Sequence, residues 1–163
     1  MDEYTRDQLD AIVARSFLPG VDADETRAVR EFLRREGANF DRYRFNVRVG
    51  EGVELRGDYT DKFKADWARR TSMRLDLVCL RDPNAATIVE GKVQWTNAAV
   101  WQLLHYRDAY QEAEPTHTID LVGVAEAYTP QAVILAKASG IRLHIYGFPP
   151  DLPAAPASRE ETV

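Results

Sequence analysis

The fold of this chain is decided by three stretches: RLDLVCL (74–80), TIVEGK (87–92) and WQLLHY (101–106). The first two are short apolar runs and predict strands, whereas the third has the period of a helix. Side chains alternate across a strand, so Glu90 and Lys92 project from one face and Gly91 from the other. If the two strands are neighbours, Asp76 joins this pair at one edge of the sheet. Two carboxylates and an ammonium then suit a divalent cation beside a phosphate.

The length and composition of the chain are those of one soluble domain. Its 163 residues are enough to bury a core, and 45% hydrophobic with 29% charged residues is typical of globular proteins. No apolar run approaches the roughly 18–20 residues of a membrane helix, and the acidic N-terminus is unlike a signal peptide, which predicts a cytoplasmic protein. The single cysteine, Cys79, excludes an internal disulfide and a thiolate-rich zinc site, and its apolar neighbours favour a buried structural thiol.

The charge of the chain is unevenly distributed. The formal net charge of −5 argues against nonspecific coating of nucleic acid. Residues 27–74 nevertheless hold thirteen Lys and Arg against eight Asp and Glu, a balance of +5, so the remainder of the chain carries −10. This basic middle can offer a surface to phosphate groups, and a solvated face of internal ion pairs is the alternative interpretation.

Local patterns divide the first half of the chain into an extension and the start of a domain. Residues 2–17 have an apolar stripe of helical period, so residues 1–21 are predicted to form an N-terminal helical extension. A second helix is capped by Asp22 or Asp24 and ends near Glu36, with Glu25 on its inward face. Residues 42–49 alternate as a half-buried strand does, with one apolar side: Tyr43, Phe45, Val47 and Val49.

A basic and aromatic insertion is expected at residues 57–72, with one or two helical turns. Its basic side chains alternate with aromatic ones: Lys62, Lys64, Arg69 and Arg70 with Tyr59, Phe63 and Trp67. This interleaving suits contact with the backbone and the unstacked bases of a nucleic acid, so the four basic residues are candidates for substrate binding. A loop that docks its aromatic rings and solvates its charges would have the same composition.

The second half of the chain alternates helices and strands. The expected elements are a helix from Thr96 or Asn97 to Glu114, a strand over 119–124, a helix from Thr129-Pro130 to Gly140 and a strand over 141–146. Strands joined through helices pair in parallel, whereas those before them form a meander, so the sheet is mixed. The domain therefore spans residues 22–148, and the Pro-rich residues 149–163 are predicted to form a flexible tail.

Four features follow one another in the chain: the acid Asp76, a loop, Glu-x-Lys at 90–92 and a helix with Gln-x-x-x-Tyr at 102–106. This pattern resembles the PD-(D/E)xK nuclease superfamily, above all its RecB-like and NucS/EndoMS-like domains. The strand-helix-strand unit over 119–146 is similar to the closing unit of those domains and of Mrr-like restriction nucleases. The resemblance covers residues 22–147. It implies a restriction endonuclease-like fold, an αβββαβ core with a mixed central sheet flanked by helices, here with the extra N-terminal helix. It also implies an endonuclease that hydrolyses DNA, or RNA, with Mg²⁺ or Mn²⁺.

The resemblance further implies a role for each residue of the motif. Asp76 and Glu90 would bind the metal through their carboxylates. The Gly91 carbonyl would be a third ligand, and Glu25 is the candidate for a further acidic one. Lys92 would hold or help to deprotonate the attacking water and offset the charge of the transition state.

Three more residues complete the candidate site. Gln102 and Tyr106 are four residues apart and share one helix face. A glutamine in an apolar stripe needs a hydrogen-bond partner, which Lys92 or the substrate phosphate would provide. Gln102 is therefore a catalytic candidate and Tyr106 a substrate-binding one. Arg74 shares the face of Asp76 and is a candidate for contact with phosphate.

Simpler interpretations remain open for all of these residues. Asp76 and Glu90 could be surface acids on exposed strand faces, with Lys92 as their ion-pair partner. In that case Gln102 would be a structural amide, and Glu25 an acid at a helix start, favoured by the helix dipole. Tyr106 would be a core residue, as would the neighbouring Trp95 and Trp101.

The middle residue of Glu-x-Lys departs from the family pattern, because it is usually apolar and here is Gly91. Glycine in a central strand marks either a bulge or a close backbone approach, and a bulge would turn Lys92 off the face of Glu90. A second hypothesis is therefore a catalytically silent nuclease-fold domain that binds nucleic acid or a protein partner. A third is an unrelated α/β domain whose acids lie apart. Specificity would come from a homodimer, a partner protein or residues 57–72.

Overall fold

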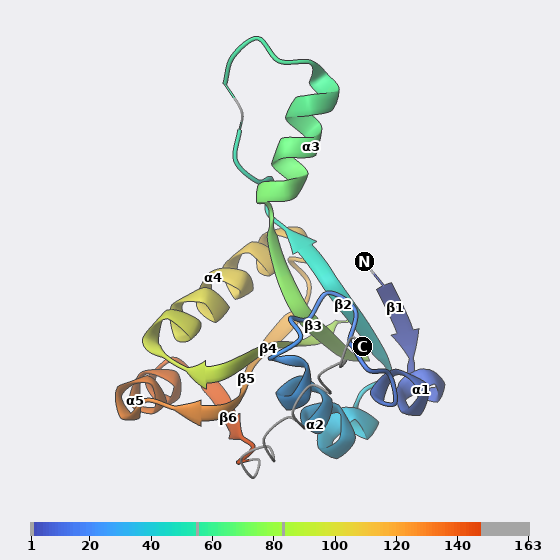
Figure 1. Ribbon diagram of the computed structural model, residues 1–163, viewed down its shortest axis with the longest axis vertical. Coiled ribbons are helices and arrows are strands. Elements are labelled where there is room, and N and C mark those ends of the chain that lie inside the picture. The colour runs from blue at the N-terminus through green and yellow to red at the C-terminus, as the bar shows by residue number, and fades with distance from the viewer. Residues whose placement is uncertain (1, 55, 83, 148–163) are drawn as a thin grey trace, which may run out of the picture.

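The computed structural model of the chain describes residues 2–54, 56–82 and 84–147, without the side chains of Arg69 and Asp82. This described part contains a six-stranded mixed sheet and five α-helices (Figure 1). None of its helices is both long and apolar enough to span a membrane. The predicted tail at residues 149–163 lies outside the described residues.

The sheet consists of two halves with different connections. Its strands follow the order of the chain: β1 (Asp2–Thr5), β2 (Arg42–Val49), β3 (Met73–Asp82), β4 (Ala85–Trp95), β5 (Thr118–Tyr128) and β6 (Ile141–Ile145). The first four strands pair antiparallel, whereas β4, β5 and β6 pair in parallel. The predicted mixed sheet is therefore confirmed, with helices crossing over between its parallel strands.

Helices cover both faces of the sheet. They are α1 (Leu9–Val13), α2 (Thr26–Glu36), α3 (Asp61–Thr71), α4 (Asn97–Ala113) and α5 (Pro130–Ala138). α1 and α2 bury their apolar side chains on one face, and α4 and α5 on the other, so the sheet separates two core clusters (Figure 1). Cys79 is fully buried in the cluster of α2, as predicted, and burial raises the pKa of its thiol.

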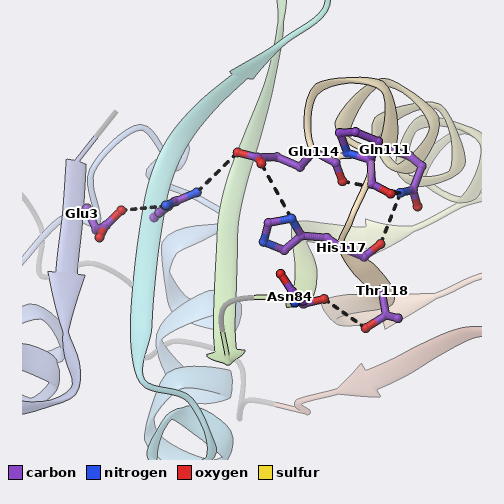
Figure 2. A network of polar contacts seen from close by, with 8 residues as sticks. Glu3, Asn84, Gln111, Glu114, His117 and Thr118 are labelled. Carbon is purple, nitrogen blue, oxygen red and sulfur yellow. Dashed lines mark hydrogen bonds and ion pairs between the residues drawn. The ribbon is translucent and has the colours of Figure 1, made fainter.

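The N-terminal segment, predicted as a helix, begins instead with strand β1, and its helical part is limited to residues 6–13. The reason is tertiary, because the edge of β2 offers backbone partners to an extended segment. Arg44 Nε donates a 2.6 Å hydrogen bond to Glu3 Oε2. Arg44 also lies 3.9 Å from Glu114, which faces His117 at 3.7 Å. Through Arg44, these side chains link β1 to the end of α4 (Figure 2).

Strand β2 changes face halfway along its length. Its four predicted apolar residues are all buried, but Tyr43 and Phe45 pack in the cluster of α2, whereas Val47 and Val49 pack in the cluster of α4. Asn46, between the two pairs, has a φ of 53°, a left-handed conformation that asparagine tolerates. The prediction of one continuous apolar side was wrong, because the left-handed residue rotates the strand.

The insertion at residues 57–72 is more helical than predicted. Instead of one or two turns it contains α3, which has 11 residues. The Thr60 hydroxyl caps this helix by accepting a hydrogen bond from the Phe63 amide. α3 projects away from the sheet (Figure 1), and the rings of Phe63 and Trp67 are exposed rather than docked on the core.

Candidate functional site

A polar cleft of about 300 Å³ opens between β3, β4, the residues before α2 and the first turns of α4. Eight residues proposed from the sequence line it: Glu25, Arg70, Arg74, Asp76, Glu90, Lys92, Gln102 and Tyr106. Segments far apart in the chain therefore meet at one place. This convergence is inconsistent with the hypothesis that the acids of the motif lie apart.

Asp76 stands at the point where β3 and β4 separate. Their last backbone pair on this side is Leu77 with Val89, and the next residues outward are Asp76 and Glu90. The Gly91 amide donates a 3.0 Å hydrogen bond to Asp76 Oδ2. Because the N–H and C=O of one strand residue point to the same neighbouring strand, the Gly91 carbonyl is also directed to the side of the Asp76 carboxylate.

Glu90 and Lys92 project from the same face of β4, as predicted. β4 pairs with β5 continuously from Glu90 to Lys92, so Gly91 introduces no bulge here. Lys92 Nζ lies 2.8 Å from Glu90 Oε1 and donates a hydrogen bond of 2.8 Å to Glu25 Oε1. Glu25 reaches this ammonium from the N-cap position of α2. One lysine therefore pairs with two carboxylates that come from different elements.

Gly91 allows α2 to approach β4 closely. A Cβ atom at this position would lie 2.6 Å from Val29 Cγ2, which is closer than carbon atoms can pack, and 3.3 Å from Glu25 Cβ. Of the two explanations for a glycine in this strand, the close backbone approach is therefore the correct one. The same approach brings Glu25 within reach of Lys92.

Burial changes the protonation of the acids in the cleft. Glu90 is 1% exposed, and burial, together with the charge of Asp76, raises its pKa to about 8. Burial also raises the pKa of Asp76 to about 6, against the opposing effects of the Gly91 amide and of Lys92. Burial by itself would lower the pKa of Lys92, but Glu90 and Glu25 outweigh it and raise that pKa. When Asp76, Glu90 and Glu25 all carry a negative charge, these three charges exceed the single positive charge of Lys92.

The second oxygen of the Glu90 carboxylate is buried and unpaired. Glu90 Oε2 accepts no hydrogen bond from any residue that the structure describes. Since buried polar atoms are nearly always paired, such an oxygen marks a place for a cation or a water. Asp76, Glu90 and the Gly91 carbonyl form an all-oxygen donor set that fits Mg²⁺ or Mn²⁺. The described residues contain no cluster of three or more His, Cys, Asp or Glu arranged to hold a metal ion, so a cation would depend on two acids, the main chain and water.

Gln102 and Tyr106 form one wall of the cleft. Gln102 Nε2 donates a 2.6 Å hydrogen bond to the Tyr106 hydroxyl, so the partner of Gln102 is this tyrosine and not Lys92. Burial raises the pKa of Tyr106. Arg70 and Arg74 line the cleft as exposed residues, and neither has an ion-pair partner in the described part of the chain. Their guanidinium groups are therefore available to an anionic ligand.

The other predicted substrate-binding residues lie elsewhere on α3. Lys62 and Lys64 do not line the cleft, and the side chain of Arg69 is not described. α3 leads away from the cleft, and its last turn reaches it through Arg70 (Figure 1). Contact between substrate and these three basic residues stays a prediction.

Sequence reasoning predicted neither Asp22 at the cleft nor the exposure of Trp101 beside it. Asp22 lines the cleft, and its charge contributes to the raised pKa of Asp76. The prediction that Asp22 or Asp24 caps the helix was wrong, because the N-cap position of α2 is Glu25.

Trp101 was expected in the core but is 61% exposed, whereas Trp95 is fully buried as expected. The spacing of residues on the helix could have indicated this exposure. Trp101 lies two residues before the buried Leu103 and therefore on the opposite side of the helix.

No known protein family, no curated protein and no solved structure matches this chain. Its function is therefore inferred from the cleft itself. The residues that carry this inference are a buried acid, a half-buried acid and a lysine on neighbouring strands, with two unpaired arginines of the described part of the chain beside them.

Proposed function

We propose that this chain is a metal-dependent nuclease that hydrolyses phosphodiester bonds in DNA, with Mg²⁺ or Mn²⁺ as its cofactor. The observation that carries the proposal is the buried, unpaired Glu90 Oε2 near Asp76. A buried oxygen of this kind is a place for a cation or a water, and an all-oxygen donor set favours a hard cation. The free guanidinium groups of Arg70 and Arg74 favour a phosphate as the neighbouring ligand.

The order of the elements supports a restriction endonuclease-like fold. From α2 onward, with α3 set aside, the chain runs α2, β2, β3, β4, α4 and β5. This order corresponds to the αβββαβ core that the resemblance to PD-(D/E)xK nucleases implies, and α5 with β6 extends it. Asp76 lies on β3, and Glu90 and Lys92 lie on β4, which are the two strands that this motif requires.

The residues of the cleft would divide the work of hydrolysis. Asp76, Glu90 and the Gly91 carbonyl would hold the cation, which when bound polarises the phosphodiester and offsets its developing charge. Lys92 keeps its proton because its pKa is raised, so it donates hydrogen bonds rather than accepting a proton. It is therefore suited to orient a water molecule and to offset charge on the phosphate. The oxygen of this water would add to phosphorus as the P–O ester bond breaks, and the proton that the water loses would pass through solvent to the leaving oxygen.

A second candidate function is favoured by the ion pairs of Lys92. Glu25 and Glu90 each hold this ammonium at 2.8 Å, so the cleft already neutralises part of its own charge. A catalytically silent domain of the same fold, binding nucleic acid or a protein partner, would contain such a closed set of ion pairs. It would bind nucleic acid with strong salt dependence and without turnover.

Cleavage assays on plasmid DNA, single-stranded DNA and RNA test the proposal. The full chain should cleave DNA in Mg²⁺ or Mn²⁺ and be inactive in EDTA. Asp76→Ala, Glu90→Ala and Lys92→Ala should each lower the rate by about a hundredfold or more, equivalent to about 3 kcal/mol of transition-state stabilisation. Glu112→Ala removes an exposed acid from α4 and should keep the wild-type rate.

Thermal melts followed by circular dichroism show whether each variant is folded. Glu90→Gln keeps the shape of the side chain and replaces Glu90→Ala if the alanine variant unfolds. Cleavage at the wild-type rate by either folded variant would refute this site. Salt-sensitive binding without any metal-dependent cleavage by the wild type would favour the silent domain instead.

A further inference from the structure

A shallow depression of about 740 Å³ lies beside the cleft, and we name it the Trp101 shelf. Its lining residues are Met73, Ala98, Trp101, Gln102, His105 and Tyr106. Met73, Gln102 and Tyr106 also line the cleft, so the shelf and the cleft are continuous. A ligand held in the cleft can therefore extend onto the shelf.

Trp101 provides the shelf with a free aromatic face. Its side chain is 61% exposed and makes no ring contact, hydrogen bond or ion pair with any described residue. His105 lies one turn further along α4, and Met73 adds a flexible apolar side chain at the border with the cleft. An apolar surface of this kind, rimmed by polar groups, is typical of a binding site.

The charges around the shelf indicate which kind of ligand it can bind. The adjoining cleft carries the guanidinium groups of Arg70 and Arg74, which have no ion-pair partner in the described part of the chain. The lining of the shelf contains no acidic side chain. A nucleotide complements this arrangement, because its phosphate is anionic and its base offers a flat face that stacks on aromatic rings.

We infer that the Trp101 shelf binds an unpaired nucleobase of a strand whose phosphate lies in the cleft. Within a duplex the faces of each base are covered by its stacked neighbours, so a paired base is not available to the indole ring. The preferred substrate class is therefore single-stranded or frayed nucleic acid. This inference rests on the proposed function, because the phosphate in the cleft determines where the base lies.

Fluorescence anisotropy separates base stacking from attraction of phosphate. The probes are a labelled single-stranded DNA oligonucleotide, an abasic strand of the same length and a blunt duplex, each in EDTA to prevent cleavage. The full chain should bind the intact strand about tenfold more tightly than the abasic strand, as expected for one stacked base. Trp101→Ala should abolish this preference without weakening abasic binding. Trp101→Phe should restore most of it.

Tryptophan fluorescence provides a readout that a purely structural role would not change. The chain has 3 tryptophans, of which Trp95 is buried, so Trp67→Phe leaves Trp101 as the exposed one. Its emission should be quenched by the intact strand and not by the abasic strand. Tyr128→Ala removes another half-exposed ring, at the end of β5, and is the matched control that should change neither readout.

Equal affinity of Trp101→Ala and the wild type for the intact strand would overturn the inference, as would tighter binding of the duplex than of the single strand. Dissociation of a dimer on Trp101→Ala, with base binding unchanged, would overturn it in favour of a second copy of the chain. Failure of the two proposals is distinguishable. Cleavage without any effect of Trp101 refutes the shelf alone, whereas base stacking without cleavage refutes the nuclease alone.

Discussion

The cleft and the projecting helix α3 both carry charged and aromatic residues, but the core of the cleft is buried whereas α3 is exposed to water. In the cleft Glu90 is 1% exposed, and Lys92 is paired with two carboxylates. On α3 Phe63 is 50% exposed, and Lys62 is exposed as well. Two strands, helix α4 and the segment before α2 assemble most of the cleft, whereas α3 begins at a local cap and projects from the sheet (Figure 1). The charges of Glu90 and Lys92 therefore depend on their neighbours, and those on α3 depend mainly on water.

This difference teaches where a sequence pattern is informative about function. Removing a carboxylate from water is costly unless a partner compensates, so a buried acid such as Glu90 constrains everything around it. An exposed lysine is solvated wherever it lies, so Lys62 is compatible with substrate contact and with a plain surface. We therefore expect small changes to damage the cleft and large changes to be tolerated on α3.

The largest effect is expected from Asp76→Asn, which should stabilise the metal-free chain while it abolishes cleavage. Burial raises the pKa of Asp76 from 3.8 to about 6, so the folded chain binds this proton more tightly than the unfolded chain. Stability should therefore fall as pH rises between these two values, and the penalty persists at higher pH. Near about pH 8 the variant should be more stable by about 1–3 kcal/mol, and near about pH 4 the difference should disappear.

Urea unfolding at a series of pH values measures this difference in the free energy of unfolding. Asp58→Asn removes an exposed acid from the segment before α3 and should change that free energy by less than about 0.5 kcal/mol at every pH. An Asp76→Asn variant less stable than the wild type near about pH 8 would contradict the burial penalty.

An effect of similar size on stability, with a smaller loss of cleavage, is expected from Gly91→Ala, which overpacks the contact between α2 and β4. The new Cβ would lie 2.6 Å from Val29 Cγ2, so overpacking should lower the free energy of unfolding by about 1–3 kcal/mol. The melting temperature should fall by about 2–4 °C for each kcal/mol. Because Glu25 moves with α2, the cleavage rate should fall as well. In the control Gly147→Ala the Cβ meets nothing within 4 Å, and an equal melting temperature of both variants would disprove the tight contact.

The smallest effect on stability is expected from Lys62→Glu combined with Lys64→Glu on α3. The free energy of unfolding should change by less than about 0.5 kcal/mol, because α3 projects from the sheet. If these lysines contact phosphates, the affinity for DNA should fall and the slope of log K against log salt should decrease by about 2. Lys137→Glu on α5 is the charge-matched control. An unchanged salt slope would identify α3 as a solvated surface.

Much of the sheet could be predicted because the relevant patterns are local. The apolar runs of β3 and β4 and the Thr129-Pro130 helix start lie within a few residues of the elements that they specify. Glu90 and Lys92 could be placed on one face for the same reason, since alternation along a strand is set by backbone geometry. Asp76 could be added because short neighbouring strands usually pair.

The features that could not be predicted depend on distant partners. Strand β1 exists because its hydrogen-bond partners lie on β2, far along the chain, while its own pattern has helical period. Asn46 rotates β2 so that Phe45 and Val47 face different clusters, and no alternation rule contains this turn. The need for Gly91 becomes clear only when Val29 of α2 lies against it.

By itself, the sequence determined the order of the main elements from α2 onward and the chemical groups available on β3 and β4, because spacing along a strand or helix follows from covalent geometry. The tertiary structure alone decided the state of those groups. It buries Glu90 and raises its pKa to about 8, brings Glu25 to Lys92 and leaves Trp101 exposed beside the cleft. The physical reason is that exclusion of water and long-range pairing depend on segments distant in the chain, which a local pattern does not describe.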